Sequence, residues 1–515
     1  MGRFLDTARR ARELARIALT ARELATSEGQ AREAARHALR DLLADARGVP
    51  MKVGQFLASF EGQDAFVPLS DGVRALPLGR IFPSIETALG RPIEEVFSEF
   101  SEDAVAASLG QVHRARLRED GAEVAVKVQY PDIAQAVEAE MRLARLIPSL
   151  GPVRRWGFDL NRYKETLHKN MLQELDYLAE AARQQRFHQS VRVPGLVIPR
   201  VHLAYTRPTV LVQDYCTGVP IRSAAAWPVE ERRVLGATLL KTLFHTLFIT
   251  GEVHGDPHFG NLLCQRGNGQ GPKVVLMDFG CTVVLPLQER MGLLRLILAS
   301  VERDSTDPLA CFCAMGFEPE KLIPIQRILP ALCEILLEPF AEDRHFSTRE
   351  WHLGRRIDAL LGELKWWFRS AGPPQLLFLL RAFQGLILQL ETLEVMLNWR
   401  ALLVETLGAE LLQQARNQTL PTPHGGEGAA LGFDALADYL KVSVTEWGEQ
   451  RVAMTMPACQ AAALESLIPE DVLERIRAAG LDVSRIARKA CESGLVPQEL
   501  FNVEAGEKCY RVWLE

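Results

Sequence analysis

The spacing of hydrophobic residues divides this chain into a helical start, a stretch with strands and a long helical region. Residues 1–50 combine Ala, Arg and Glu with Leu and Ile at near-helical spacing, which predicts helix. From 217 to about 416, hydrophobic residues recur at three- and four-residue steps, so mainly helices are expected there. Between these regions, short β-branched or alternating runs predict strands at 124–130 (VAVKVQY), 197–203 (VIPRVHL) and 209–215 (TVLVQDY).

The most apolar stretch, residues 375–390 (QLLFLLRAFQGLILQL), predicts a buried helix. It is shorter than the roughly 20 residues needed to cross a bilayer, and it carries Arg381 near its middle. We therefore expect no membrane span here.

A Pro- and Gly-rich break at 417–428 (NQTLPTPHGGEG) predicts a linker to a small C-terminal domain. In that domain, 451–456 and 509–515 are expected to be strands, with two short helices between about 459 and 492. Its role cannot be inferred from its residues.

Composition changes this picture little. A chain of 515 residues suggests about three folding units at roughly 150 residues per domain. Nine Cys without a CxxC pair are typical of thiols in a reducing compartment, so we expect a cytoplasmic protein. The net charge of −6 gives no electrostatic reason to expect nucleic-acid binding, and the oligomeric state is left open.

The charge of the first 50 residues differs in sign from that of the whole. They hold ten Arg and seven acidic residues, a surplus of three positive charges (10 − 7). Such a helix could lie on anionic lipid, which would make the protein peripheral to a membrane. The alternative is a solvated helix that packs on the rest of the chain.

Two motifs provide the residues that phosphoryl transfer needs. Residues 254–261 (HGDPHFGN) precede an apolar strand that ends in 278–280 (DFG). Asp256 would orient or deprotonate the attacking hydroxyl, while Asn261 and Asp278 would hold Mg²⁺ through oxygen atoms. The alternative is that both Asp residues merely occupy turns.

Two upstream segments fit the same chemistry. Lys127 ends the run VAVK and would reach toward the phosphates of ATP, although a strand Lys can also be a solvated edge charge. Residues 104–113 (AVAASLGQVH) stand where an ordinary kinase has a glycine-rich loop, and a plain strand–turn–strand is the alternative. The candidate nucleotide contacts in this loop are Ala106, Ala107, Ser108, Gly110 and Gln111. By contrast, the glycines of 267–271 (GNGQG) are explained by a hairpin turn.

With these motifs, the chain resembles the ABC1/UbiB family of atypical kinases, also called AarF-domain or coenzyme-Q8-type kinases. Two further pieces carry the resemblance: Lys52-x-Gly54-Gln55, and Glu174-Leu175-Asp176-Tyr177. The resemblance covers about residues 45 to 400.

The resemblance implies an α+β, two-lobed protein-kinase-like fold that binds ATP with Mg²⁺. Glu174 would pair with Lys127, and Asp176 belongs to the family's ExD signature. Asp214 and Cys216 would offer backbone groups to adenine at the hinge between the lobes. Lys52 and Gln55 would lie over the site where a protein kinase admits its peptide.

Some residues depart from the family's pattern. Position 183 is Arg where the family commonly has Asn, and the segment after Gln55 lacks the usual Arg-Pro-Asp-Leu-Leu-Pro run. The implied organisation is a helical extension (1–85), an N-terminal lobe (86–216), a C-terminal lobe (217–416), a linker (417–429) and a small α/β domain (430–515).

The expected activity is that of an atypical kinase or ATPase that supports quinone or isoprenoid-lipid metabolism, with a lipid or quinone precursor as a candidate ligand. No Ala-Pro-Glu follows the DFG motif, and the HGD motif lacks the Arg that would read a phosphorylated activation loop, which argues against protein substrates. The alternatives are a small-molecule kinase of the aminoglycoside- or choline-kinase type and a nucleotide-sensing pseudokinase scaffold.

Overall fold

The computed structural model describes residues 75–138, 160–422 and 437–515, together with Thr20. Within these ranges, positions 108, 268, 270, 363, 438, 448, 479, 493, 494, 496, 506 and 507 are excepted. The described residues form two compact units, one within 1–148, 161–285 and 375–397, the other within 149–160, 286–374 and 398–515. The predictions for Lys52, Gly54, Gln55 and Ser108, and most of the N-terminal helix, lie outside the described residues.

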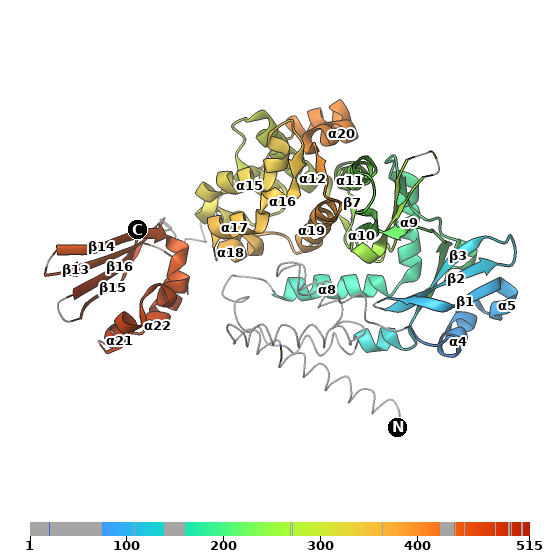
Figure 1. The fold of residues 1–515 in the computed structure, drawn as a ribbon, viewed down its shortest axis with the longest axis horizontal. Helices are drawn as coiled ribbons and strands as arrows, with labels where there is room; N and C mark the ends of the chain where they lie inside the picture. The colour runs from blue at the N-terminus through green and yellow to red at the C-terminus, as the bar shows by residue number, and fades with distance from the viewer. Residues whose placement is uncertain are drawn as a thin grey trace, which may run out of the picture. The chain divides into compact units, whose positions relative to one another are not determined.

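The first unit begins with a four-stranded antiparallel sheet in the order β1-β2-β3-β5 (Figure 1). Its strands are β1 (Phe97–Ala106), β2 (Gly110–Leu117), β3 (Glu123–Gln129) and β5 (Val210–Asp214). The alternating hydrophobic residues of β3 and β5 are buried, which confirms the strands predicted at 124–130 and 209–215 to within a residue at each end.

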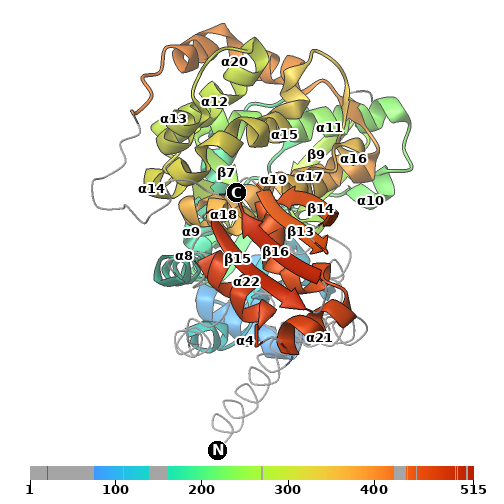
Figure 2. The ribbon, with the colours of Figure 1, turned by 90° about the vertical axis from the view of Figure 1, so that its left-hand side faces the viewer.

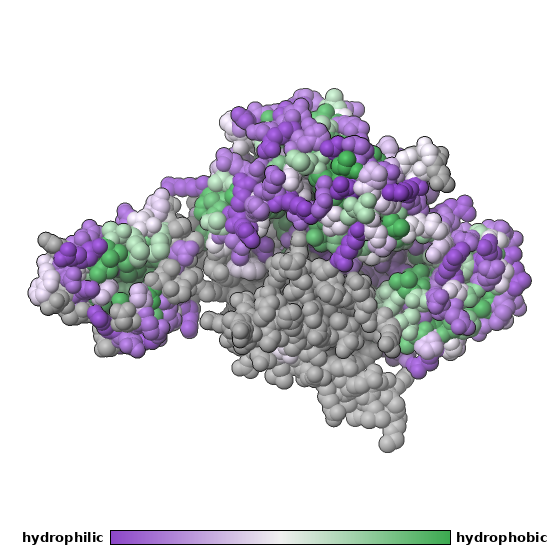
Figure 3. Space-filling model, in the orientation of Figure 1, coloured by the Kyte–Doolittle hydropathy of each residue, from purple (hydrophilic) through white to green (hydrophobic). Residues whose placement is uncertain are grey.

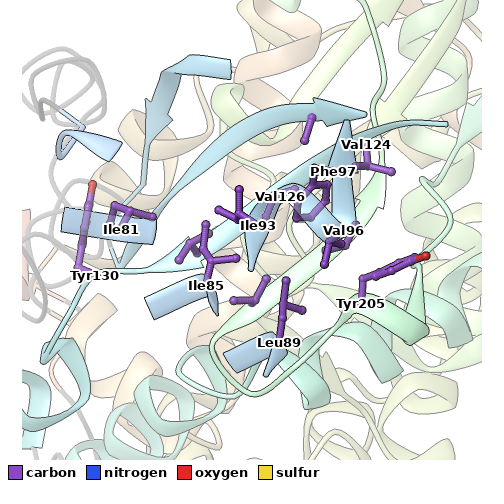
Figure 4. Packing of buried hydrophobic residues seen from close by; sticks show 14 of the residues in the cluster. Ile81, Ile85, Leu89, Ile93, Val96, Phe97, Val124, Val126, Tyr130 and Tyr205 are labelled. Atoms are coloured by element: carbon purple, nitrogen blue, oxygen red, sulfur yellow. The ribbon is translucent and has the colours of Figure 1, made fainter. Parts of the chain in front are cut away.

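Two helices cover this sheet, α4 (Leu78–Leu89) and α5 (Ile93–Val96). Ile81, Ile85 and Leu89 recur at four-residue steps, so they share the face of α4 that packs against Val124 and Val126 of β3 in one hydrophobic cluster (Figure 4). Complete burial of one such side chain contributes about 1.5–3 kcal/mol.

The prediction of a strand over 197–203 is wrong for most of its length. Only β4 (Leu196–Val197) is a strand, and it pairs in parallel with β9 (Lys273–Leu276). Pro199 has no N–H to donate, and the chain beyond it lies along β5 through single contacts such as His202 N to Val212 O at 2.8 Å. A short 3₁₀ turn, η2 (Leu203–Tyr205), follows.

Between β3 and β4 the described residues include α8 (Leu160–Glu174) and α9 (Tyr177–Ser190). Asp176 separates them as the N-cap of α9, because its carboxylate accepts hydrogen bonds from the backbone N–H groups of Leu178 and Ala179. This cap fixes where α9 begins, and α9 carries the side chains that reach the functional site.

In the remainder of the first unit, the HGD motif begins at the end of β7 and the DFG motif lies between β9 and β10. Its elements are β6 (Val219–Pro220), α10 (Ile221–Ala224), α11 (Val229–Phe244), the π-helical turn η3 (His245–Thr250), β7 (Glu252–His254), η4 (Phe259–Asn261), β8 (Leu262–Gln265), β9, β10 (Thr282–Val284), α19 (Leu376–Leu393) and β12 (Met396–Leu397). Strands β8 and β9 form the antiparallel hairpin predicted from the glycines of 267–271. Gly269 and Gly271 have φ of 82° and 76°, values that only glycine adopts at low cost.

The predicted helix at 375–390 corresponds to α19. Of the described helices, α19 alone is long and apolar enough to cross a membrane by length and composition, and 44% of its apolar window is buried within the protein.

The second unit starts as a group of helices, as the hydrophobic spacing of this region predicts. They are α12 (Leu287–Glu302), α13 (Pro308–Ala314), α14 (Pro319–Leu322), η5 (Ile323–Ile328), α15 (Leu329–Ala341), α16 (Thr348–Trp351), α17 (Leu353–Leu361), α18 (Leu364–Ala371) and α20 (Trp399–Arg416), with the two-residue strand β11 (Phe346–Ser347). The fully buried Trp351 and Trp399 meet edge to face, with ring centroids 6.2 Å apart.

Residues 437–515 form a separate α/β fold with its own core. Strands β13 (Tyr439–Glu446), β14 (Glu449–Pro457), β15 (Gln498–Ala505) and β16 (Lys508–Leu514) make an antiparallel sheet in the order β14-β13-β16-β15 (Figure 2). The helices are η6 (Ala458–Leu467), α21 (Glu470–Ala478) and α22 (Val483–Glu492), and their apolar residues share a cluster with Leu440 and Val512 of the sheet. Its visible surface carries both hydrophobic and hydrophilic patches (Figure 3). Val452 and Met454 of β14 are exposed.

Candidate active site

A buried lysine joins three parts of the first unit. Lys127 Nζ of β3 lies 2.8 Å and 3.0 Å from the carboxylate oxygens of Glu180 on α9, and 3.3 Å from Oδ1 of Asp278 in the DFG motif. The ammonium also lies 5.0 Å from the ring centroid of Tyr177. The lysine predicted from the VAVK run therefore lies beside the predicted metal ligand Asp278.

The partner of Lys127 corrects the expectation that Glu174 would form this pair. Glu174 is the last residue of α8 and lies before the cap of α9, whereas Glu180 lies one turn into α9 on the side that faces β3. Glu174 lies close by: its Cγ is 3.5 Å from the point where a Cβ on Gly280 would stand. A sequence signal for Glu180 existed, since a strand lysine is expected to pair with a helical glutamate, but two glutamates six residues apart were available.

Helix α9 also holds the DFG backbone. Arg183 Nε donates to Phe279 O at 2.8 Å, and its Nη2 donates to Gly280 O at 3.1 Å. The ring of Phe279 is fully buried between Phe187 of α9 and His254 of β7, at centroid distances of 4.9 Å and 5.4 Å. The arginine that departs from the family's pattern thus fixes the segment that carries Asp278.

Asp278 itself has a left-handed backbone, with φ of 60°. Its Oδ1 accepts a hydrogen bond from Gly280 N at 3.1 Å, which stabilises this turn locally. Non-glycine residues in this region cost of order 1–3 kcal/mol and persist where the surroundings hold them, often at functional sites.

The HGD motif forms the opposite side of the site. Asn261 Nδ2 donates to Asp256 O at 2.9 Å, so the amide group of Asn261 is held with its oxygen as the remaining acceptor. His254 Nε2 donates to the carbonyl of Asp278 at 2.6 Å, which links the two motifs directly. The pairing of β7 with β10 continues this link, and Gly255 N donates to Cys281 O at 2.9 Å.

Sequence reasoning missed one residue that contacts Asp256. Arg381 of α19 donates from Nη2 to Asp256 Oδ1 at 2.7 Å, and both side chains are only 12% exposed. The signal available was an arginine in the middle of an otherwise apolar helix, a position that requires a buried partner.

Burial and neighbouring charges set the ionisation of the site. Burial alone would lower the pKa of Lys127, but the carboxylates of Asp278 and Glu180 raise it well above its ordinary value, so the lysine is charged. Burial raises the pKa of Glu180 against the attraction of Lys127. Burial lowers the pKa of His254, which is consistent with a neutral ring that donates from Nε2.

The loop that replaces the glycine-rich segment is a tight turn between β1 and β2. Ala106 ends β1, and Ala107 N donates to Gly110 O at 2.7 Å. Gly110 has no room for a side chain, because a Cβ there would stand 2.2 Å from the carbonyl oxygen of Val128. The strand–turn–strand weighed as an alternative is thus present, and a nucleotide contact by the backbone of this turn stays a prediction.

The side chain of Gln111 points into the protein interior, and a nucleotide contact by its backbone stays a prediction. Its side chain is fully buried, with Oε1 accepting from Leu76 N at 2.7 Å and Nε2 lying 2.8 Å from His113 Nε2. The side chain instead ties β2 to the start of the fold, because a buried amide must satisfy both of its polar ends.

The predicted hinge residues follow β5. The backbone N–H of Asp214 donates to Arg200 O at 2.9 Å. The carboxylate of Asp214 accepts a hydrogen bond from Arg200 N and pairs with His202. Of the backbone groups of Asp214, the carbonyl therefore remains the candidate for the expected contact with adenine. Cys216 is half-buried, burial raises the pKa of its thiol, and its backbone contact with adenine stays a prediction.

Asn261 and Asp278 fit a magnesium ion by the chemistry of their donors. Both provide hard oxygen atoms, and Mg²⁺ in nucleotide sites takes one or two protein oxygens besides phosphate and water. Among the residues that the structure describes, no group of three His, Cys, Asp or Glu side chains could hold a metal. This arrangement therefore fits a metal that is coordinated by both protein and phosphate oxygens better than one coordinated by protein side chains alone.

A strand lysine paired with a helical glutamate, facing an HGD loop and a DFG turn, defines a protein of the kinase-like class. Residues 68–310 match the family model of the ABC1 atypical kinase-like domain, so this part of the chain is similar to that family.

The names of curated relatives describe kinases. The chain is 31% identical over 324 residues to a probable protein kinase UbiB from Cronobacter sakazakii, covering 59% of either chain. It is 30% identical over 309 residues to the chloroplastic protein ACTIVITY OF BC1 COMPLEX KINASE 1 from Arabidopsis thaliana, covering 57% of this chain and 44% of that one. The matched part is thus about half the length of these relatives.

A solved structure, Rv3197 from Mycobacterium tuberculosis in complex with erythromycin, is also similar. It is 25% identical, with a TM-score of 0.49, and the match covers 73% of this chain and 96% of the other.

Proposed function

We propose that the protein binds Mg-ATP and either hydrolyses it or transfers its γ-phosphoryl group to a small or lipid-linked acceptor, in support of quinone or isoprenoid-lipid metabolism. The observation that carries this proposal is the contact of Lys127 with both Glu180 and Asp278. This geometry directs one buried positive charge at the place where phosphates would meet a metal-binding aspartate.

Each residue has a distinct part in the proposed reaction. Lys127 binds phosphate oxygens and is held by Glu180, while Asn261 and Asp278 hold Mg²⁺, which neutralises phosphate charge when bound. Asp256 orients the hydroxyl or water that attacks phosphorus. The oxygen of that nucleophile forms the new P–O bond and gives its proton to the Asp256 carboxylate, the bond to the β-phosphate oxygen breaks, and ADP leaves.

The acceptor is proposed to be small or lipid-linked because of the segment that comes directly after the DFG motif. Residues 282–284 pair with β7, and Leu285 N donates to Gly251 O at 2.8 Å, so this segment is part of the fold directly after Gly280. In protein kinases the corresponding segment presents the substrate peptide. The link to quinone or isoprenoid lipids rests on the family resemblance. We also propose a cytoplasmic protein whose Arg-rich N-terminal residues contact anionic lipid peripherally.

The test is a turnover assay with purified full-length protein, Mg-ATP, and vesicles of anionic phospholipid with or without a polyprenyl quinone precursor. We expect slow phosphate release that requires Mg²⁺, increases with vesicles and leaves protein unlabelled. Asp278→Asn is expected to abolish metal-dependent thermal stabilisation by ATP, and unchanged stabilisation would contradict its role as a ligand.

The same assay distinguishes the alternative functions. Phosphate on a small hydroxylated compound would favour a small-molecule kinase. Nucleotide binding without turnover under any of these conditions would favour a nucleotide-sensing scaffold.

A further inference from the structure

Helix α19 presents one polar face to the catalytic loop. Arg381, Gly385 and Gln389 are spaced by four residues, so they lie along one side of the helix. Each of the three meets the loop at Asp256 or Pro257. The remaining residues of α19 are mostly Leu, Ile and Phe, so this polar face is a distinct feature of the helix.

The three contacts are of different kinds and converge on two consecutive residues. Arg381 forms the ion pair with Asp256 Oδ1, and Gln389 Nε2 donates to Pro257 O. Gly385 allows close approach, because a Cβ there would stand 2.9 Å from Pro257 Cγ and 3.2 Å from Pro257 O. The helix therefore holds the loop by side chain and by backbone.

The Arg381–Asp256 pair is buried, so forming it requires that two charged groups lose their hydration. Both side chains are only 12% exposed, and an isolated buried charge costs several kcal/mol. The charged and titratable groups that act on Arg381 are Asp256, Cys281 and Glu174. The pair thus lies among the acidic side chains of the site. A separate hydrogen bond, from Arg232 Nη1 of α11 to Leu393 O at 2.5 Å, attaches the C-terminal end of α19.

We infer that Arg381 is a positioning residue for phosphoryl transfer, which fixes the rotamer of Asp256 while Gly385 and Gln389 fix the backbone at Pro257. The inference rests on the proposed function and deepens it. A carboxylate in a fixed rotamer meets the attacking group in one orientation, and misplacement by about 1 Å can lower a rate by about 10²-fold.

The test compares Mg-ATP turnover and Mg-ATP binding by the full-length protein and its variants. Arg381→Met is expected to lower kcat by about 10²-fold while the Kd for Mg-ATP changes by less than about threefold, because Lys127, Asn261 and Asp278 are untouched. Arg381→Lys is expected to recover part of the loss, and millimolar guanidinium ion to rescue Arg381→Met but not wild type.

A matched control removes the other arginine bound to α19. Arg232→Met deletes a contact at the end of the helix that is remote from Asp256, so we expect lower stability with unchanged kcat. If Arg381→Met does not fold, Gly385→Ala provides the second variant. Its added methyl group would press on Pro257, and it is expected to lower kcat with Arg381 intact.

The possible failures are distinguishable. Turnover by wild type with unchanged kcat in Arg381→Met, or loss without any recovery by lysine or guanidinium, would overturn the positioning role alone. No turnover by wild type under any condition would overturn the proposed function and this inference together.

Discussion

At the scale of single residues, the site depends on which carboxylates meet Lys127. The lysine is paired with a nearly inaccessible Glu180 and a more exposed Asp278. Glu180 is only 1% exposed, whereas Asp278 is 36% exposed and therefore accessible to a ligand. The carboxylate of Glu180 therefore orients the lysine, while Asp278 and the phosphates of a bound nucleotide would both contact it.

Glu180→Gln should separate the roles of the two glutamates. The change keeps the shape of the side chain but removes a charge-assisted bond worth about 1.5–3 kcal/mol, so we expect ATP turnover to fall about 10- to 100-fold. The measurement is kcat/KM for ATP, with Glu174→Gln as the matched variant. A larger loss in Glu174→Gln than in Glu180→Gln would contradict the pairing seen here.

Arg183→Lys should loosen the DFG segment. Lysine provides a point charge and cannot donate to the carbonyls of Phe279 and Gly280 in the fork geometry of arginine. We expect the free energy of unfolding to decrease by about 1–3 kcal/mol and Mg-ATP binding to weaken. Denaturant titration measures the first and thermal shift the second.

The control for Arg183 lies on the same helix. Arg186 forms a surface ion pair with Glu252, and such pairs contribute about 0–1 kcal/mol. Arg186→Lys should therefore have a small effect, and equal effects of the two substitutions would contradict the role assigned to Arg183.

At the scale of elements, the start of α9 controls the site. Asp176→Ala removes both cap hydrogen bonds and should lower stability by about 1 kcal/mol, whereas Asp176→Asn keeps a good cap. The measurement is unfolding free energy together with turnover. If Asp176→Asn folded with full stability but lost turnover, the carboxylate would have a chemical role that capping does not explain.

The elements also show what the sequence could and could not predict. Strong local patterns were sufficient for β3, β5, the β8–β9 hairpin and the helix at α19, because alternation, glycine turns and apolar runs act over short distances. The strand at 197–203 was wrong because a proline interrupts the ladder after Val197. The direction of the Gln111 side chain could not be predicted, because its hydrogen bonds to Leu76, a residue distant in sequence, determine it.

The site residues follow the same division. Asp256, Asn261, Asp278 and Lys127 lie in recognisable motifs, and the structure brings Lys127 to Asp278 and Asn261 to Asp256. The choice between Glu174 and Glu180 depends on where a helix cap falls, and the contact of Arg381 depends on the tertiary fold. Neither can be derived from periodicity alone.

At the scale of the whole molecule, buried histidines make stability depend on pH. Burial lowers the pKa values of His113, His245 and His254, so the unfolded chain takes up protons below about 6.5 while the folded chain resists them. The free energy of unfolding should therefore decrease as pH falls through 6.5. Thermal unfolding between pH 7.5 and 5.5 measures this slope.

His113 provides the test variant. Its Nε2 lies beside the Gln111 amide and its Nδ1 beside Ser101 O, so a second ring proton has no acceptor to meet. His113→Gln should make the pH slope shallower, because burial lowers the pKa of the ring that it removes. An identical slope in wild type and His113→Gln would exclude His113 as a source.

The discontinuous first unit has a consequence for synthesis. Arg381 follows Asp256 by 125 residues, and the family match ends at residue 310, before α19 begins. During translation the catalytic loop leaves the ribosome well before its buried counter-charge, and the long loop must close before the pair can form. A chain truncated at the family boundary would keep every recognisable motif yet lack α19, so maturation of the site is expected to be a late step in folding.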